Sequence, residues 1–84
     1  MIFKAVIEVA LKPGYSDPEG DVTCRSLRDL GYADVAEVNV GKVYRVRFRA
    51  ASREEAEKMV DEFCRRLLAN PVKDDYRFEV EPER

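Results

Sequence analysis

The strict alternation of apolar and polar side chains near the start of the chain constrains the fold most. Apolar residues occupy the odd-numbered positions from Phe3 to Leu11, whereas Lys4 and Glu8 stand at even-numbered positions. A period of two predicts a β-strand over residues 2–11 with one buried face. Pro13-Gly14 ends this pattern, so the chain is expected to turn there.

Three more segments alternate in the same way and predict further strands. The segment 35–40 is short and has its apolar side chains in one phase. In the segment 42–50, apolar residues alternate with a row of arginines. We expect these two segments to pair through a turn at Gly41-Lys42. Residues 76–81 alternate as the last strand.

Two segments show helical spacing. Asp17 is expected to cap a helix that runs to Leu30, with Pro18 at its first position and Gly31 as a left-handed C-cap. Residues 52–55 form a capping box, and Asn70-Pro71 ends the second helix. The apolar face of this second helix is predicted to contain Ala56, Met59, Val60, Phe63, Cys64 and Leu67.

The order of these elements predicts the α+β class, as a ferredoxin-like βαββαβ sandwich. Both helices would cover one face of an antiparallel sheet whose first and third strands are central. The 84 residues allow a single domain, residues 1–84, and so small a core favours an oligomer. The outer face of the sheet is expected to carry Lys4, Val6, Glu8, Arg45, Arg47, Arg49, Glu79 and Glu81.

No catalytic, metal or cofactor site is expected in this chain. It has no histidine, so a serine or cysteine nucleophile lacks its usual base, and Cys24 and Cys64 read as buried free thiols. The carboxylate pairs at residues 54–55 and 74–75 are expected to serve a helix start and a loop. The net charge of −2 disfavours a nucleic-acid partner, and no apolar run is long enough to span a membrane. We therefore expect a cytoplasmic protein.

The sequences at the junctions, taken in order, resemble one known family. They include residues 11–14 (Leu-Lys-Pro-Gly), residues 17–20 (Asp-Pro-Glu-Gly), residues 30–32 (Leu-Gly-Tyr), residues 40–42 (Val-Gly-Lys) and residues 67–72 (Leu-Leu-Ala-Asn-Pro-Val). This set is similar to that of the PurS family, the small subunit of phosphoribosylformylglycinamidine synthase. The arginine-rich segment 45–49 departs from the family pattern.

The resemblance implies an accessory role in purine biosynthesis. The family's enzyme converts formylglycinamide ribonucleotide (FGAR), glutamine and ATP to the amidine (FGAM), glutamate, ADP and phosphate. PurS would bridge a glutaminase subunit and a large synthetase subunit, as a homodimer or homotetramer, while ATP and magnesium bind the synthetase. The residues expected at turns or partner interfaces are Lys12, Asp17, Gly41, Lys42, Asn70 and Pro71.

Two other readings share the predicted order of elements. A small-molecule regulatory module of the ACT kind would use the glycine turn at Pro13-Gly14. A ferredoxin-like RNA binder would need aromatic side chains on the outer face of the sheet, but Tyr44 and Phe48 fall in the core phase.

Overall fold

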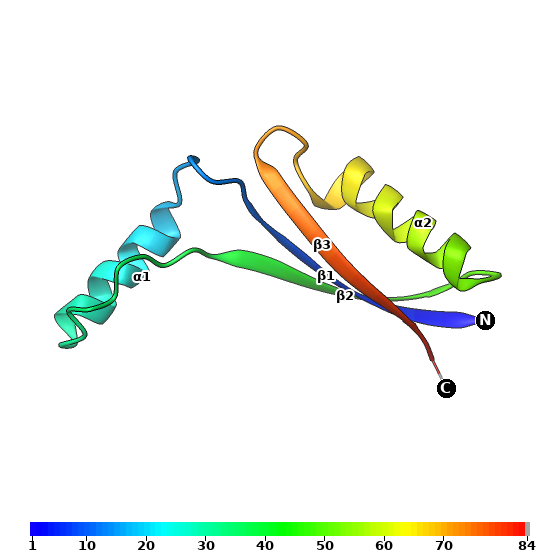
Figure 1. The fold of residues 1–84 in the computed structure, drawn as a ribbon, viewed down its shortest axis with the longest axis horizontal. Coiled ribbons are helices and arrows are strands. Elements are labelled where there is room, and N and C mark those ends of the chain that lie inside the picture. Colours follow the sequence, from blue (N-terminus) through cyan, green and yellow to red (C-terminus); the bar gives the residue numbers. More distant parts are fainter. Residues whose placement is uncertain (84) are drawn as a thin grey trace.

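The computed structural model describes residues 1–83, in which three strands form one antiparallel sheet in the order β2-β1-β3 (Figure 1). The predicted α+β class, an antiparallel sheet with two helices, is confirmed. β1 is central as predicted, whereas the segment expected to be the second central strand lies at an edge as β2. The elements are β1 (Ile2–Leu11), α1 (Pro18–Asp29), β2 (Gly41–Arg49), α2 (Arg53–Phe63), the π-helical turn η1 (Cys64–Leu68) and β3 (Asp74–Pro82).

The core lies between α2 and one face of the sheet. The apolar phase of β1 is buried as predicted, and Phe3 and Ile7 are enclosed together with Val60 and Cys64. Phe48 of β2 meets Phe63 of α2 edge to face, with ring centroids 5.7 Å apart. Each fully buried large apolar side chain contributes roughly 1.5–3 kcal/mol, so this single layer of contacts holds the sheet to α2.

The helix starts follow the predicted capping chemistry. The Ser52 hydroxyl accepts a hydrogen bond from the Glu55 amide at 3.2 Å, and the Glu55 carboxylate accepts one from the Ala51 amide at 2.8 Å. Asp17 caps α1, and Gly31 follows that helix with a φ of 108°, in the left-handed region. These contacts confirm the predicted helix caps. Caps could be predicted because they form between residues that are close in sequence.

Residues 35–40 are not a strand, which corrects the prediction of a fourth strand and of a hairpin at Gly41-Lys42. Within the described chain this segment pairs with no strand; Gly41 and Lys42 instead open β2 opposite Ala10 and Val9. Its first carbonyls are bound to α1, since the Arg28 guanidinium donates to the carbonyls of Val35 and Ala36 at 2.8 and 3.2 Å. The segment therefore runs straight into β2.

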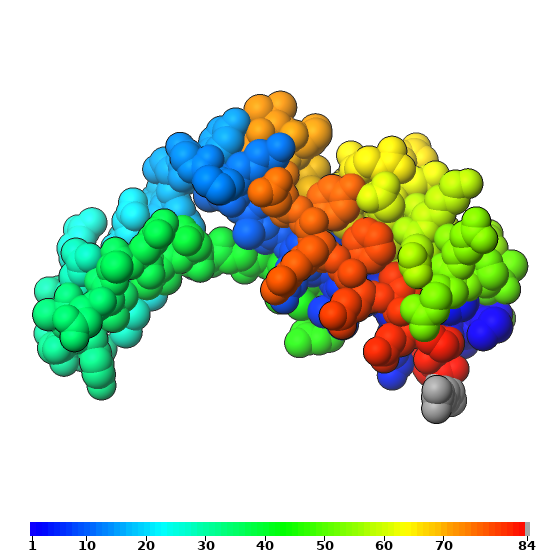
Figure 2. Space-filling view, viewed as in Figure 1, coloured from blue at the N-terminus to red at the C-terminus, as the bar shows by residue number. Residues whose placement is uncertain are grey.

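α1 does not cover the sheet, which corrects the prediction that both helices share one face. Figures 1 and 2 show α1 and residues 35–40 projecting as a thin arm beyond the end of the sheet. The radius of gyration is 16.5 Å, whereas a compact chain of this length has about 12 Å. We call residues 18–40 the arm.

The end of the second helix also differs from the prediction. α2 passes into η1, where the amide of Ala69 donates to the carbonyl of Cys64 at 2.9 Å. The wider π-turn breaks the 3.6-residue period, so Leu67, predicted in the core, is 83% exposed. Leu68 packs against the core instead.

Candidate functional site: the turn end of the sheet

Three chain segments meet at the end of the sheet from which the arm projects: residues 11–17, 40–42 and 69–74. We call them the turn end. All six residues expected at turns or interfaces lie here, in two neighbouring groups. Lys12 and Pro71 line a cavity of about 260 Å³ with Asn70 adjacent to them, whereas Asp17, Gly41 and Lys42 line a second one of about 570 Å³.

The larger cavity is an open groove between the start of the arm and the start of β3. Its lining includes the end of β1, Leu68, and the group Asp17, Pro18 and Lys42. Lys42 is exposed at this groove, while Gly41 belongs to the strand. A Cβ on Gly41 would lie 2.9 Å from the Val9 carbonyl oxygen, so the glycine permits close pairing of β1 and β2.

Asp17 fastens the arm to the sheet. One carboxylate oxygen accepts the amide of Gly20 and the other accepts the amide of Val40, both at 2.9 Å. These two hydrogen bonds lower the pKa of the Asp17 carboxyl below its ordinary value, and the bond from Val40 has the larger effect. Asp17 therefore joins the first turn of α1 to the entry of β2.

Asn70 and Asp74 organise the loop before β3. The Asn70 side chain accepts the Val72 amide at 2.9 Å, and Asp74 accepts the Asn70 amide at 2.8 Å. The loop is tied to the end of β1, because the Lys12 amide donates to the Lys73 carbonyl at 2.7 Å. These contacts present Pro71 and Val72 on the surface, where the Tyr15 hydroxyl donates to the Val72 carbonyl.

A side-chain network borders the smaller cavity and was not predicted. Asp61 accepts hydrogen bonds from the Tyr76 hydroxyl and from Arg65, each at 2.6 Å. The pKa of Asp61 is lowered, first by Tyr76 and then by Arg65, and the pKa of Tyr76 is raised by Asp61. The four-residue spacing of Asp61 and Arg65 could have indicated their ion pair. Nothing local links them to Tyr76.

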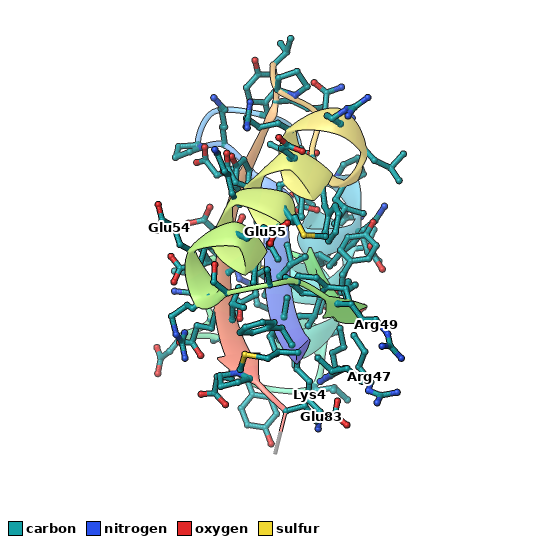
Figure 3. The ribbon with its side chains drawn as sticks, turned by 90° about the vertical axis from the view of Figure 1, so that its right-hand side faces the viewer. Lys4, Arg47, Arg49, Glu54, Glu55 and Glu83 are labelled. Atoms are coloured by element: carbon teal, nitrogen blue, oxygen red, sulfur yellow. The ribbon has the colours of Figure 1, made fainter. Side chains whose placement is uncertain are left out.

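Several ionisable groups of the turn end are engaged in hydrogen bonds or ion pairs. Asp74 is engaged with Asn70, and Asp75 forms an ion pair with Lys12 at 3.9 Å. Glu54 and Glu55 lie in the first turn of α2 (Figure 3), as the sequence indicated. Across residues 1–83 there is no cluster of three side chains suited to a metal ion, and no helix long and apolar enough to cross a membrane.

Cys24 and Cys64 are buried free thiols, as expected. Burial raises the pKa of the Cys64 thiol, with Asp61 adding to the effect. A thiol kept protonated in this way is a poor nucleophile.

Comparison with known proteins identifies relatives over nearly the whole chain. The family model described as "PurS: Phosphoribosylformylglycinamidine (FGAM) synthase" matches residues 4–82. The phosphoribosylformylglycinamidine synthase subunit PurS of Archaeoglobus fulgidus is 47% identical over 72 residues, which cover 86% of this chain and 90% of that protein.

Solved structures give the same result. Thermus thermophilus PurS superposes with a TM-score of 0.88 at 36% identity, and the match covers 100% of both chains. A chain in the structure of PurLQS from Thermotoga maritima superposes with a TM-score of 0.87 at 30% identity, covering 96% of this chain and 99% of that one. The alternative of an ACT-like regulatory module is not favoured by these matches.

Proposed function

The chain belongs to the PurS family of phosphoribosylformylglycinamidine synthase subunits, and we propose that it bridges the glutaminase and synthetase subunits of that enzyme. It is an accessory subunit in purine biosynthesis. The observation that carries the proposal is the match of the whole chain to free-standing PurS proteins and to a chain of a PurLQS structure. FGAR, glutamine and ATP would be converted to FGAM, glutamate, ADP and phosphate by the complete enzyme, in the cytoplasm.

The turn end is the surface that we assign to the partner subunits. Its loops are held by the sheet and by side-chain caps, so they present Pro71 and Lys42 in fixed positions at little entropic cost. Lys12 is partly neutralised by Asp75. In contrast, Lys42 forms no ion pair with any described residue, which leaves its charge available to an acidic group of a partner.

A rigid bridge fits the chemistry of the reaction. Ammonia released by the glutaminase must reach the synthetase without equilibrating with water, where it would become protonated. An accessory subunit that holds the two sites in fixed contact favours this transfer. ATP and magnesium are assigned to the synthetase subunit.

We also propose that the arm binds a second copy of this chain, as part of a homodimer or homotetramer. α1 makes at most marginal contact with the other helices and strands, and the arm exposes Val22 and Leu30. The far edge of β2 has no partner strand within residues 1–83. A second copy could cover both surfaces, and the fourth-strand pattern of residues 35–40 suits that free edge.

Complex formation tests the bridge. The glutaminase and synthetase subunits of the same organism are mixed with and without this chain and separated by size. We expect one complex of all three only when the chain is present. Co-elution of the other two subunits at the same size and affinity without it would contradict a bridging role.

The variant Lys42→Glu tests the assignment of the turn end. We expect calorimetry to show partner binding weakened by about tenfold or more, because a like charge would face the partner's acid. Lys58→Glu, an exposed lysine on α2, is the matched control and should bind as the parent chain does. Equal affinity of both variants would remove Lys42 from the interface.

A further inference from the structure

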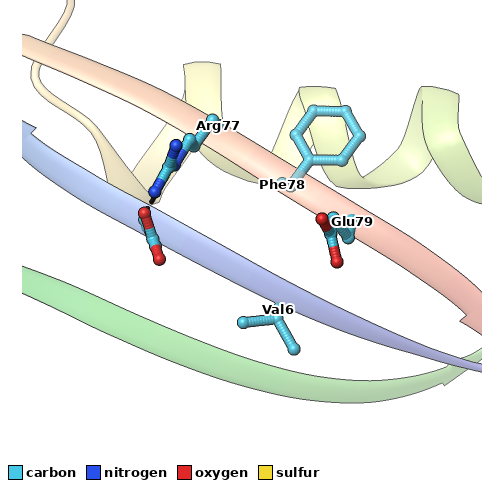
Figure 4. A pocket seen from close by; sticks show the side chains of 5 residues that line it. Val6, Arg77, Phe78 and Glu79 are labelled. Atoms are coloured by element: carbon cyan, nitrogen blue, oxygen red, sulfur yellow. Dashed lines mark hydrogen bonds and ion pairs between the residues drawn. The ribbon is translucent and has the colours of Figure 1, made fainter.

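The groove at the turn end is lined by residues of the arm and also by residues of the three strands, α2 and η1, which we call the body. Pro18, Glu19 and Val40 belong to the arm, whereas Lys42 and Leu68 belong to the body. A hollow of about 270 Å³ on the outer face of the sheet differs, because its lining comes from β1 and β3 alone (Figure 4). Paired strands hold that hollow in shape, but the shape of the groove depends on how the arm is attached.

Contacts along the arm join α1 to the segment 35–40. The Arg28 guanidinium donates to the carbonyls of Val35 and Ala36, and the Cys24 thiol donates to the Val35 carbonyl at 3.9 Å. These contacts hold the helix and the segment together, while α1 makes at most marginal contact with the body. A change at the base of the arm therefore shifts the arm as one unit.

Gly20 allows α1 and the segment 35–40 to approach each other closely. It is buried in the first turn of α1, and a Cβ at this position would overlap the carbonyl oxygen of Val38. The same Cβ would lie 3.0 Å from the carboxylate of Asp17. Because the carbonyl belongs to the backbone, no change of side-chain rotamer relieves the overlap. No residue with a Cβ therefore fits here without a shift of the segment.

Such a shift would be passed to the contact between Asp17 and Val40. The Val40 amide, two residues after Val38, donates to the Asp17 carboxylate at 2.9 Å. Directly beyond it, Gly41 is paired with β1 in the sheet, so the start of β2 resists displacement. The arm would therefore move while Lys42 stays in the sheet, and the two parts of the groove lining would separate.

We propose that Gly20 is a positioning residue for partner binding. By setting the direction of the arm, it holds the arm side of the groove at the distance from Lys42 that a partner subunit requires. Gly20 acts through the groove and touches neither the partner nor the reacting molecules. This inference rests on the proposed role of the turn end in binding the partner subunits.

The charges of the lining favour an acidic segment of the partner subunit as the occupant of the groove. Asp17 and Asp74 already accept hydrogen bonds from backbone amides. Glu19 lies in the first turn of α1, where the helix dipole favours a carboxylate. Lys42 and Lys73 form no ion pair with any other residue that the structure describes. The groove can therefore supply two ammonium groups to a segment that carries carboxylates.

Gly20→Ala tests the proposal without removing a charge or a side-chain hydrogen bond of the groove. In the full chain, hydrogen exchange at the amides of residues 20 and 40 should become faster by about tenfold or more, and exchange in β1, α2 and β3 should stay unchanged. Calorimetry with the glutaminase and synthetase subunits should show partner binding weakened by about tenfold. Lys58→Ala, exposed on α2 and outside the groove lining, is the control and should bind as the parent does.

A double-mutant cycle separates positioning from a general loss of folded chain. If Gly20 acts by positioning the groove around Lys42, the variant that combines Gly20→Ala with Lys42→Glu should bind only slightly more weakly than Lys42→Glu alone. A smaller fraction of folded chain would instead multiply the loss caused by Lys42→Glu. The cycle therefore measures an effect that a merely structural role of Gly20 does not produce.

Several results would overturn the proposal. They are unchanged partner affinity of Gly20→Ala, losses that multiply in the double variant, and faster exchange throughout the body, since Gly20 would then support the fold as a whole. A parent chain that binds neither subunit would contradict the proposed function itself, and this inference with it.

Discussion

At the scale of single residues, Asp17 links sequence, structure and assembly most directly. Its carboxylate is a helix cap, as the Asp-Pro pair indicated, but it also binds the amide of Val40. The second contact joins groups 23 residues apart, so no local pattern could reveal it. Asp17 therefore caps α1 and also links the two ends of the arm by hydrogen bonds.

Replacement of Asp17 should loosen the start of the arm. Asp17→Ala removes both acceptors, and we expect the thermal midpoint to fall by about 5 °C. Asp17→Asn keeps one acceptor oxygen, so its thermal midpoint should lie between those of Asp17→Ala and the parent. Equal midpoints for all three proteins by circular dichroism would show that the carboxylate does not hold the arm.

The lowered pKa of Asp17 also has a pH consequence. A carboxyl whose pKa is depressed by folding stabilises the fold above its unfolded value, near 3.9, and loses that contribution as pH falls through the folded value. Asp17→Asn should therefore lose less stability than the parent on acidification below about pH 4. Chemical denaturation at neutral and acid pH measures this difference, and identical acid dependence would contradict it.

Tyr76 should ionise above the ordinary range of a tyrosine side chain. The hydrogen bond to Asp61 raises its pKa, so its stabilising contribution is complete below the unfolded value near 10 and is lost as pH rises through the folded value. Absorbance at 295 nm should show tyrosine ionisation at a pH above about 10, and this phase should be absent from Tyr76→Phe. A titration unchanged by that replacement would disprove the assignment.

At the scale of elements, alternation and capping predicted the strands of the sheet and both helix starts. These patterns gave a wrong prediction where a segment forms its hydrogen bonds with a side chain outside the segment. Residues 35–40 alternate like a strand, yet the carbonyls of Val35 and Ala36 accept hydrogen bonds from Arg28. The turn end shows the same limit, because its six residues were expected as turns, while the grouping of five of them around two neighbouring cavities depends on the sheet register.

The π-turn gives an element-scale prediction that opposes the helical period. Leu67→Ala should change the free energy of unfolding by less than about 0.5 kcal/mol, because the side chain is already in solvent. Val60→Ala, on the buried face of α2, should cost about 2 kcal/mol. Urea denaturation at matched concentration compares them, and a larger cost at Leu67 would place that residue in the core.

At the scale of the whole molecule, the chain is extended and leaves surfaces without a partner inside the described residues. Its radius of gyration exceeds the compact value because the arm is unsupported, and β2 leaves an edge open within the described chain. The sequence predicted association from the small core and from the family resemblance. The arm could be recognised only from the coordinates, because its position depends on the topology of the sheet.

Association through the arm should depend on its apolar side chains. Leu30→Glu places a charge on a side chain that is 74% exposed in one chain, so the monomer tolerates it while a buried contact with a second copy does not. We expect light scattering to show smaller assemblies for this variant. Asp29→Lys, an exposed charge change on the same helix, is the control. If Leu30→Glu forms assemblies of the same size as the parent, the arm is not a contact between copies.

The central claim, an accessory role in glutamine-dependent FGAM formation, is tested most directly by reconstitution. Glutaminase and synthetase subunits are assayed with FGAR, ATP and magnesium, with and without this chain, using either glutamine or ammonium chloride as nitrogen donor. The account predicts that glutamine-dependent FGAM formation requires the chain, whereas formation from ammonium chloride needs only the synthetase. Equal glutamine-dependent rates with and without the chain would contradict it.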